Sequence, residues 1–323
     1  MRVSPISQFV ANFSKRRVLV AGDAILDAAV YGHRLGTSTE TTAVVAAEDR
    51  SEYTFGGASL VVRNLLALGA AVHYITVLGD DTSAAAYQTF IDPKLITTFI
   101  TEAGRKNTVK KRFWVDGKMV LQFDVRDDRD ISAHTQEQVL HAVTKKLAAV
   151  DLMVIADNRH GVLAAALIPR LLAAAKAAGV LVYLDSQVSK RPSNHRSYQG
   201  VDVVCCNLVE AQAIEKKFNP AKPESGLRAI RQALSAGTVV VKLGERGSAA
   251  LVDRRVIETP AHRVTAVDTT GAGDAFLSAL GVSHGAPWEQ ALELANIWAG
   301  LSTVIQGPNP PERSAFVAAV ARK

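Results

Sequence analysis

Short apolar runs alternate with longer segments of helical length along most of the chain. The runs are rich in Val, Ile and Leu and lie at 17–21, 72–78, 152–156, 180–184, 203–206 and 239–243. Such runs are typical of strands covered on both faces, and the segments between several of them, such as 132–150, have the length of helices. The pattern predicts an α/β fold with a mostly parallel central sheet and helices on both of its faces.

Residues 28–54 and 108–125 interrupt this rhythm with short pieces of alternating polarity. In the second segment two alternating runs flank Asp116-Gly117, a strong signal for a β-hairpin. In the first, alternating pieces at 28–31 and 43–47 are separated by a Gly-Thr-Ser-Thr turn. We therefore expect a small β-lid outside the main sheet, within a single domain that spans residues 1–323.

The composition is that of an ordinary globular protein of 323 residues, with 48% hydrophobic and 21% charged side chains. The formal net charge is +6, but the basic residues form short clusters mixed with acids, which favours small anionic molecules over nucleic acid as partners. Cys205 and Cys206 are adjacent, which suits neither a metal site nor an ordinary disulfide and indicates a reducing compartment. Without an apolar run of signal-peptide or transmembrane length, we expect a cytoplasmic protein with no membrane partner.

The most informative stretch is 267–276, where small polar residues lead into the apolar run 275–282. This transition predicts a helix start, capped by Thr269 or Thr270, whose first-turn N–H groups stay open to an anion because Gly271, Ala272 and Gly273 carry no bulky side chain. Asp274 falls in the first turn, where we expect an ionised carboxylate that can orient an attacking hydroxyl and accept its proton. The alternative is an ordinary capped helix with a surface acid.

The order Asp-Thr-Thr-Gly-Ala-Gly-Asp-Ala-Phe at 268–276 resembles the C-terminal signature of the ribokinase-like (PfkB) carbohydrate kinases. The resemblance implies the ribokinase-like fold, transfer of a phosphoryl group from ATP with Mg²⁺, and Asp274 as the catalytic base beside an anion hole at Gly271, Ala272 and Gly273. It leaves a monovalent cation open as a further cofactor. The lid of this family covers the sugar and often pairs with that of a second subunit, so we expect a homodimer.

The sugar side resembles the family less closely. Residues 22–27 resemble its first-strand end, and the resemblance implies that Asp27 binds sugar hydroxyls; the alternative is a solvated loop aspartate. Gly56 and Gly57 open a helix as in the other signature of the family. However, Leu60 stands where the family usually has a sugar-contacting asparagine, which removes hydrogen-bonding capacity. Asn64, four residues later, cannot simply substitute.

The nucleotide side matches better. Asn207 and Glu210 resemble the family's Asn-x-x-Glu element, which organises magnesium and phosphates through water, although the same pair fits an ordinary helix capping box. Lys242 stands where a threonine is common, so it either meets a phosphate or lengthens a polar edge. The residues that the resemblance assigns to the nucleotide are Asn207, Glu210, Lys242, Gly244, Glu245, Gly247, Thr270 and Asn296.

Four segments are Gly22-Asp23-x-x-Leu26-Asp27, Ser38-Thr39-Glu40 before Val44-Val45, Lys110-x-Arg112 and the turn from Asp157 to Gly161. They resemble the kinase half of bacterial enzymes that phosphorylate D-glycero-β-D-manno-heptose 7-phosphate. A phosphorylated substrate would require cationic groups, for which Lys110, Lys111 and Arg112 are candidates. The chain departs from this branch at Asn158, His160 and Gln122, positions that would contact the sugar or its phosphate. It also has Asp185-Ser186-Gln187 where the branch has Asp-Pro-Lys.

Two other classes of function remain open. A nucleotide- or sugar-binding descendant without catalysis is favoured by Leu60 and opposed by the intact run at 268–276. A Rossmann oxidoreductase would need a Gly-x-Gly-x-x-Gly turn after the first strand, where this chain has Gly22-Asp23.

Overall fold

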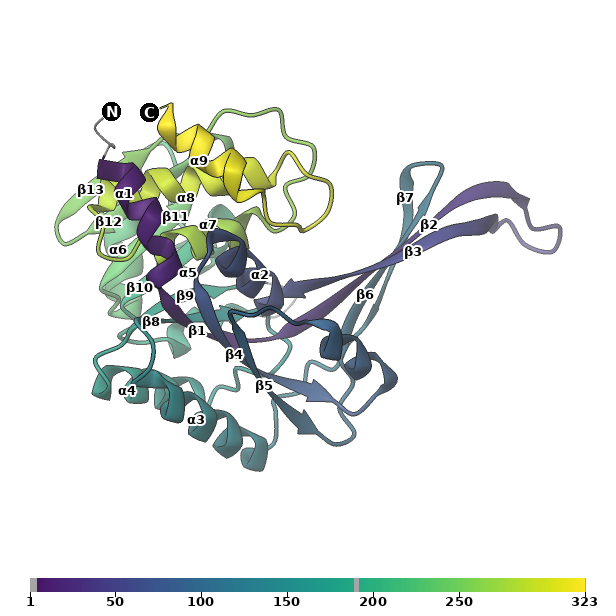
Figure 1. Ribbon diagram of the computed structural model, residues 1–323, viewed down its shortest axis with the longest axis horizontal. Helices are drawn as coiled ribbons and strands as arrows, with labels where there is room; N and C mark the ends of the chain where they lie inside the picture. The colour runs from purple at the N-terminus through teal and green to yellow at the C-terminus, as the bar shows by residue number, and fades with distance from the viewer. Residues whose placement is uncertain (1–4, 189–191, 323) are drawn as a thin grey trace.

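The protein is described by a computed structural model that covers residues 5–188 and 192–322 (Figure 1). A nine-stranded sheet with the order β13-β12-β11-β10-β9-β8-β1-β4-β5 runs through it. The first seven of its strands along the chain are parallel, which confirms the prediction: β1 Arg17–Gly22, β4 Ala71–Gly79, β5 Leu95–Glu102, β8 Leu152–Asp157, β9 Leu181–Ser186, β10 Val203–Asn207 and β11 Thr238–Lys242. The hairpin of β12 (Ser248–Val252) and β13 (Arg255–Thr259) adds an antiparallel edge.

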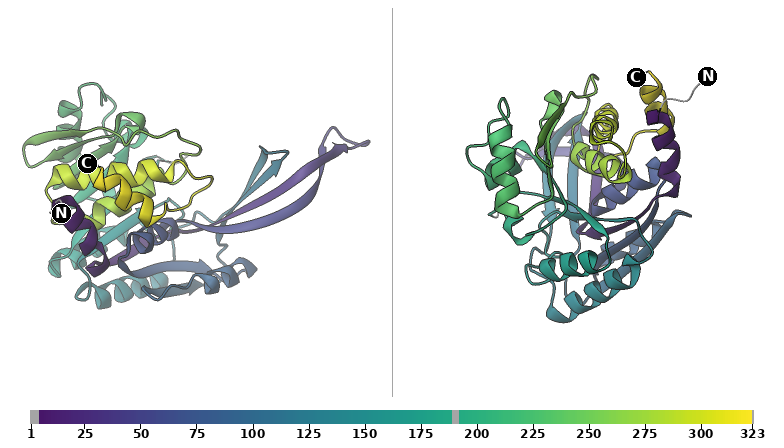
Figure 2. Two further views of the ribbon diagram at one scale, coloured as in Figure 1. Left: turned by 45° about the horizontal axis from the view of Figure 1, so that its top comes forward. Right: turned by 90° about the vertical axis from the view of Figure 1, so that its left-hand side faces the viewer.

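Helices cover both faces of this sheet (Figure 2). Successive side chains of a strand point to opposite faces of the sheet, and in β1 both faces are apolar. Val18 and Val20 belong to one buried apolar cluster, and Leu19 and Ala21 belong to a second cluster on the other face. The first cluster is completed by α1 (Pro5–Asn12), α2 (Ala58–Leu68), α7 (Ala272–Val282), α8 (Trp288–Ser302) and α9 (Arg313–Ala321). The second is completed by α3 (Ala133–Leu147), α4 (Ile168–Ala177), α5 (Leu208–Ile214) and α6 (Glu224–Leu234).

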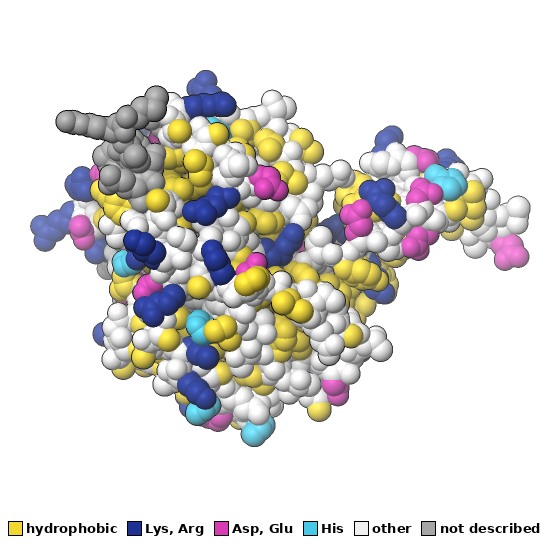
Figure 3. Space-filling model, in the orientation of Figure 1, with side chains coloured by type: hydrophobic (Ala, Val, Ile, Leu, Met, Phe, Trp, Pro, Cys, Tyr) yellow, Lys and Arg dark blue, Asp and Glu magenta, His cyan; other side chains and the backbone are white. Residues whose placement is uncertain are grey.

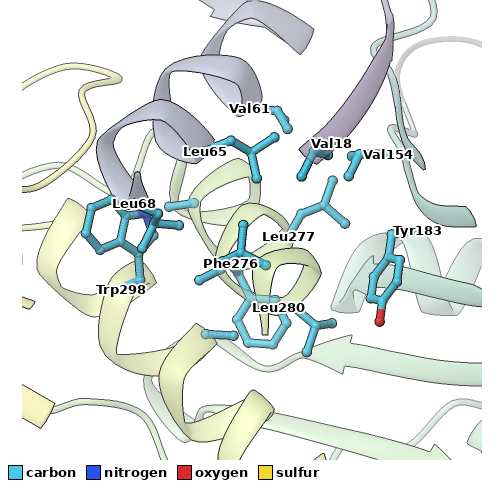
Figure 4. Packing of buried hydrophobic residues seen from close by; sticks show 14 of the residues in the cluster. Val18, Val61, Leu65, Leu68, Val154, Tyr183, Phe276, Leu277, Leu280 and Trp298 are labelled. Atoms are coloured by element: carbon cyan, nitrogen blue, oxygen red, sulfur yellow. The ribbon is translucent and has the colours of Figure 1, made fainter. Parts of the chain in front are cut away.

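The packing of α2 against α7 fixes the start of α7 at the edge of the sheet. Figure 4 shows Leu65 and Leu68 of α2 beside Phe276 of α7, and all three are buried. Burying such side chains stabilises the fold by about 1.5–3 kcal/mol each. The buried Asn64 belongs to this core, because its Oδ1 accepts a hydrogen bond from Trp298 Nε1 at 2.8 Å. Asn64 therefore does not replace the missing asparagine at position 60, as expected.

A second sheet of four strands, with the order β3-β2-β6-β7, projects from the body (Figures 1 and 3). Its hairpins are β2 (Ala24–Thr37) with β3 (Val44–Gly57), and β6 (Thr108–Val115) with β7 (Lys118–Val125). The turn between β6 and β7 is the predicted one, with positive φ angles of 50° at Asp116 and 75° at Gly117.

The short strand pieces predicted at 28–31 and 43–47 are wrong in length. Strands β2 and β3 have 14 residues each and pair along almost their whole length. Most of β3 is exposed, so no buried face imposes a continuous alternation on its sequence. Within the described residues, no helix has both the length and the apolar character needed to cross a membrane.

Candidate active site

The predicted helix start is the N-terminus of α7, although its cap differs from the prediction. Gly271 is the N-cap residue, with a φ of 80°, and no side chain caps the helix. The proposed caps Thr269 and Thr270 are therefore wrong, because the left-handed glycine lies between them and the first turn. The loop is held instead by Asp268, which accepts hydrogen bonds from the N–H groups of Thr270 (2.8 Å) and Gly307 (3.0 Å).

The first turn of α7 keeps donors for an anion. The N–H of Ala272 already donates to Thr269 O at 3.2 Å. Those of Gly273 and Asp274 lie in the first turn, where a helix has no intrahelical acceptor for them. Of the three residues assigned to an anion hole, Gly273 thus has the best placed N–H donor. The positive end of the helix dipole also favours an anion at this position.

Asp274 does not have the ordinary acidity that we expected. Burial and the neighbouring Asp185 carboxylate raise the pKa of Asp274 to about 7, whereas Lys242 and Lys110 oppose this rise. The expectation that the helix start holds this carboxylate ionised is therefore incomplete, because loss of solvent outweighs the dipole. A carboxyl group with a pKa near neutrality is well matched to general-base catalysis.

Lys242 lies at the end of β11 and donates a hydrogen bond to Asp185 at the end of β9. Its side chain is only 13% exposed and that of Asp185 only 11%. Burial alone would lower the pKa of Lys242, but Asp185 and Glu210 outweigh it and raise the pKa above its ordinary range. The lysine is therefore charged and forms a largely buried ion pair.

Glu210 and Asn207 form the capping box that the alternative interpretation predicted. Glu210 Oε2 accepts from Asn207 N (2.7 Å), Oε1 accepts from Asn207 Nδ2 (2.8 Å), and Asn207 Oδ1 accepts from Glu210 N (2.9 Å). Burial and Asp185 raise the pKa of Glu210 to about 7. Glu210 thus belongs to the same electrostatic cluster as Asp185, Lys242 and Asp274, and a role with magnesium stays a prediction.

The other residues assigned to the nucleotide border this cluster or α8. Gly244 and Glu245 lie in an exposed turn that ends at Gly247. Gly247 has a φ of 90°, and a Cβ at this position would lie 2.0 Å from Thr259 O, so the turn requires glycine there. Thr270 is exposed. Asn296 is buried and donates its amide to Ser248 Oγ and Leu292 O, both at 2.9 Å. Their contacts with a nucleotide stay predictions.

On the acceptor side, the lid brings cationic groups to Asp27. Strand β2 pairs with β6, and Arg112 of β6 forms an ion pair with the buried Asp27. The Asp27 carboxylate can lie at this place only because residue 56 is a glycine, since a Cβ at Gly56 would lie 2.2 Å from Asp27 Oδ2. Lys110 is on the same face of β6 and lowers the pKa of Asp274. Lys111 lines a cavity of about 500 Å³ on the other face of the strand, so its contact with a substrate phosphate stays a prediction.

The residues that depart from the family pattern lie close to these groups. Leu60 is buried against the N-cap of α7, since a Cβ at Gly271 would lie 2.6 Å from Leu60 Cδ2. Within the described residues, the buried Asn158 Oδ1 has no hydrogen-bond partner, and a Cβ at Gly57 would lie 2.9 Å from it. His160 pairs with Asp128 at 2.8 Å. Among the described residues of the acceptor side, Asn158 Oδ1 is thus a buried polar atom that is available to a ligand.

Sequence reasoning missed Asp23 and Asp185. Asp23 is buried and accepts N–H groups of Asn158 (2.9 Å), His160 (3.2 Å) and Val162 (3.0 Å), which fixes the loop after β8. Both acids directly follow or end apolar strand runs at the carboxyl edge of the sheet. That position in the sequence was the signal that could have identified them.

The sheet order, the projecting lid and the position of α7 define the ribokinase-like class of α/β folds. Ribokinase of Arabidopsis thaliana, solved in complex with ribose and ATP, is 19% identical, with a TM-score of 0.74 over 94% of this chain and 98% of the other. Phosphofructokinase-2 of Escherichia coli, solved with fructose-6-phosphate, is 16% identical, with a TM-score of 0.76 over 95% and 98%. At these identities the likeness shows the fold alone.

The chain belongs to the pfkB family of carbohydrate kinases, whose sequence profile matches residues 15–314. It is 33% identical over 301 residues to the bifunctional protein HldE of Rhodopseudomonas palustris (strain BisA53), which covers 90% of this chain and 60% of that protein. The HldE protein of Caulobacter vibrioides (strain ATCC 19089 / CIP 103742 / CB 15) is 31% identical over 297 residues, with the same coverage. The chain thus spans about three fifths of the length of these relatives.

Proposed function

We propose that residues 1–323 form one kinase domain, which transfers the γ-phosphoryl group of ATP to a hydroxyl of a sugar or sugar phosphate. The observation that carries the proposal is the position of Asp274, with its pKa near 7, in the first turn of α7 beside the ammonium of Lys242. Phosphoryl transfer requires donors for the phosphate charge and a group that orients the attacking hydroxyl, and the first turn of α7 would supply both.

The acceptor would bind between Asp27, Gly56, Gly57 and the lid strand β6. Asp27 would accept hydrogen bonds from sugar hydroxyls, and Arg112, which pairs with Asp27 in the described structure, would remain available to an anionic substituent. Lys110 adds a second positive charge on the same face. Two cations beside a sugar site favour a phosphorylated acceptor, and the HldE relatives together with the resemblance to heptose kinases make heptose 7-phosphate the first candidate.

Magnesium would enter this site with ATP. Among the residues that the structure describes, no group of three His, Cys, Asp or Glu side chains could hold a metal ion. Carboxylates that form no metal cage, such as Glu210 and Asp274, fit Mg²⁺ that is bound by phosphates and water, because this ion keeps several waters and needs few protein ligands. When bound, Mg²⁺ would neutralise charge on the phosphates. A requirement for a monovalent cation stays open.

The lid would also pair two copies of the chain. Its edge strand β7 exposes Leu121 (53%) and Phe123 (57%), and its other edge, β3, exposes Tyr53 (65%). Exposed strand edges with large apolar side chains promote pairing, and a two-fold contact between lids would cover them. We therefore propose that the protein forms a homodimer through its lid. We also propose that it acts in the cytoplasm, with no nucleic acid or membrane as a partner.

Leu60 is proposed to determine acceptor specificity. It brings an apolar group to the N-cap of α7, where the family usually presents an amide. We expect this protein to use heptose 7-phosphate less efficiently than kinases that have asparagine at this position. Leu60→Asn should raise kcat/KM for this substrate, through a gain of about 1–3 kcal/mol in the free energy of transition-state binding. Efficient turnover by the wild type that Leu60→Asn leaves unchanged or slows would contradict this role.

The proposed function is tested by ADP release over a panel of acceptors, which includes heptose 7-phosphate, hexose phosphates, hexoses and pentoses. We expect acceptor-dependent ADP release for at least one sugar. ATP binding without ADP release on any sugar would instead support the alternative, a binding protein derived from a kinase.

A further inference from the structure

Lys242 is aimed at the first turn of α7. A Cβ built on Gly273 would lie 3.1 Å from Lys242 Nζ, so the ammonium lies directly against the side of Gly273 that carries no side chain. The same nitrogen donates a hydrogen bond to Asp185. The positive charge of the lysine and the free N–H of Gly273 therefore lie side by side at the carboxyl edge of the sheet.

The surroundings of this ammonium are strongly acidic. Asp185 of β9 and Glu210 of α5 both raise the pKa of Lys242. The pKa of Asp274 in α7 is raised by burial, by Asp185 and by Asp27 of β2, and it is lowered by Lys242 and by Lys110 of β6. Near Gly273, three acidic side chains thus surround Lys242, and a polyphosphate would meet more negative charge without this lysine. The ammonium therefore favours the approach of an anion to this turn.

We propose that Lys242 is a catalytic residue that binds the terminal phosphate of the nucleotide, and that Asp185 is its positioning residue, holding the ammonium beside Gly273 before the nucleotide arrives. This inference rests on the proposed function and assigns a role within it. Lysine suits the task because it acts as a compact point charge on a flexible stem.

The chemical step leaves Lys242 unchanged. The acceptor hydroxyl oxygen forms a bond to the γ-phosphorus, the bond between that phosphorus and the bridging oxygen breaks, and ADP departs with the bonding electron pair. The hydroxyl proton passes to Asp274. Lys242 stays protonated throughout and stabilises the charge on the transferred group, which is the contribution expected of a preorganised cation.

The position of Lys242 predicts that its effect depends on the number of phosphates. The test is calorimetric affinity for ATP, ADP and AMP, measured with Mg²⁺ and again in excess chelator, for wild type and Lys242→Met. Loss of one charge-assisted hydrogen bond should weaken ATP binding by about 10- to 100-fold. Binding of AMP should change less than threefold. Lys242→Arg should recover part of the ATP affinity, and Lys176→Met, which alters an exposed lysine of α4, is the matched control.

Removal of Lys242 alone leaves Asp185 buried without its partner, which can prevent folding. The double variant Lys242→Met/Asp185→Asn removes both charges and supplies a second test, with the same selective loss of ATP affinity expected. If either folded variant binds ATP as tightly as wild type, the lysine is only a structural partner of Asp185 and the inference is overturned.

Asp185→Asn separates the positioning role from phosphate binding. It keeps the ammonium but removes the group that holds it, so we expect kcat to fall at least tenfold while the affinity for ATP stays within threefold of wild type. Unchanged kcat would overturn the role given to Asp185. If no sugar is phosphorylated but Lys242→Met still weakens ATP binding selectively, the proposed function fails while the phosphate contact of Lys242 stands.

Discussion

Replacement of Asp274 by asparagine should abolish phosphoryl transfer and, at alkaline pH, stabilise the fold. The amide keeps the size of the side chain but cannot accept the proton of the acceptor hydroxyl, so turnover should fall by at least about 10²–10⁴. The gain in stability follows from the raised pKa of Asp274, which burial and Asp185 move from 3.8 to about 7. In its ionised form, Asp274 thus lowers the free energy of unfolding.

The sign of this effect follows from proton linkage. Between the pKa of the unfolded chain and that of the folded protein, Asp274 holds a proton only in the folded state. Its contribution to stability is therefore fully present below about pH 4 and is lost as the pH rises through 7. The difference between 3.8 and about 7 corresponds to at most about 4 kcal/mol at pH 8. Partial exposure of Asp274 makes this figure an upper bound.

The assay is urea unfolding of wild type and Asp274→Asn at pH 5, 6, 7 and 8, with Asp130→Asn as a control at an exposed acid outside the site. We expect the stability advantage of Asp274→Asn to grow with pH and the control to show none. The kcat/KM of the wild type should fall about tenfold for each pH unit below 7, because the base must be ionised. An Asp274→Asn variant that is less stable at pH 8, or that retains turnover within tenfold of wild type, would refute this reasoning.

Three further predictions follow from the site and the lid. Gly273→Ala should fold but bind ATP at least about tenfold more weakly, because its methyl group would lie 3.1 Å from Lys242 Nζ and displace the ammonium; unchanged calorimetric affinity would contradict this. Phe123→Glu should convert a dimer into a monomer in light scattering, because it places a charge on the apolar edge strand β7, whereas Lys118→Gln on the same strand should not; a wild-type monomer would rule out lid pairing. Excess chelator should reduce transfer to background and Mg²⁺ should restore it, since the described residues offer no cage of three metal-binding side chains; full activity in chelator would exclude the metal.

The main sheet could be predicted from the sequence because its strands are buried on both faces and leave continuous apolar runs, as at β1 and β8. Strand β5 was not predicted, since at the edge of the sheet its polar and apolar positions do not form such a run. The length of β2 and β3 was missed for a related reason, because an exposed ribbon places few demands on side-chain polarity.

Within the site, the local signals were the reliable ones. The start of α7 and the pairing of Asn207 with Glu210 depend on residues that are neighbours in the chain. The contact between Lys242 and Asp185 joins residues that are 57 positions apart in the chain, so no local sequence pattern predicts it. The pKa of Asp274 likewise depends on burial and on Asp185, so the sequence indicated the position of the carboxylate but not its acidity.

The central claim is that Asp274 and the first turn of α7 transfer the γ-phosphoryl group of ATP to a sugar hydroxyl. The most direct measurement uses ATP labelled with ¹⁸O in the γ-phosphate, the acceptor panel, and mass spectrometry of the sugar products. We predict one sugar phosphate that carries the intact labelled phosphoryl group, formed in equal amount to ADP by wild type and undetectable with Asp274→Asn. A label that appears only in inorganic phosphate, or a labelled sugar that Asp274→Asn forms at the wild-type rate, would contradict the account.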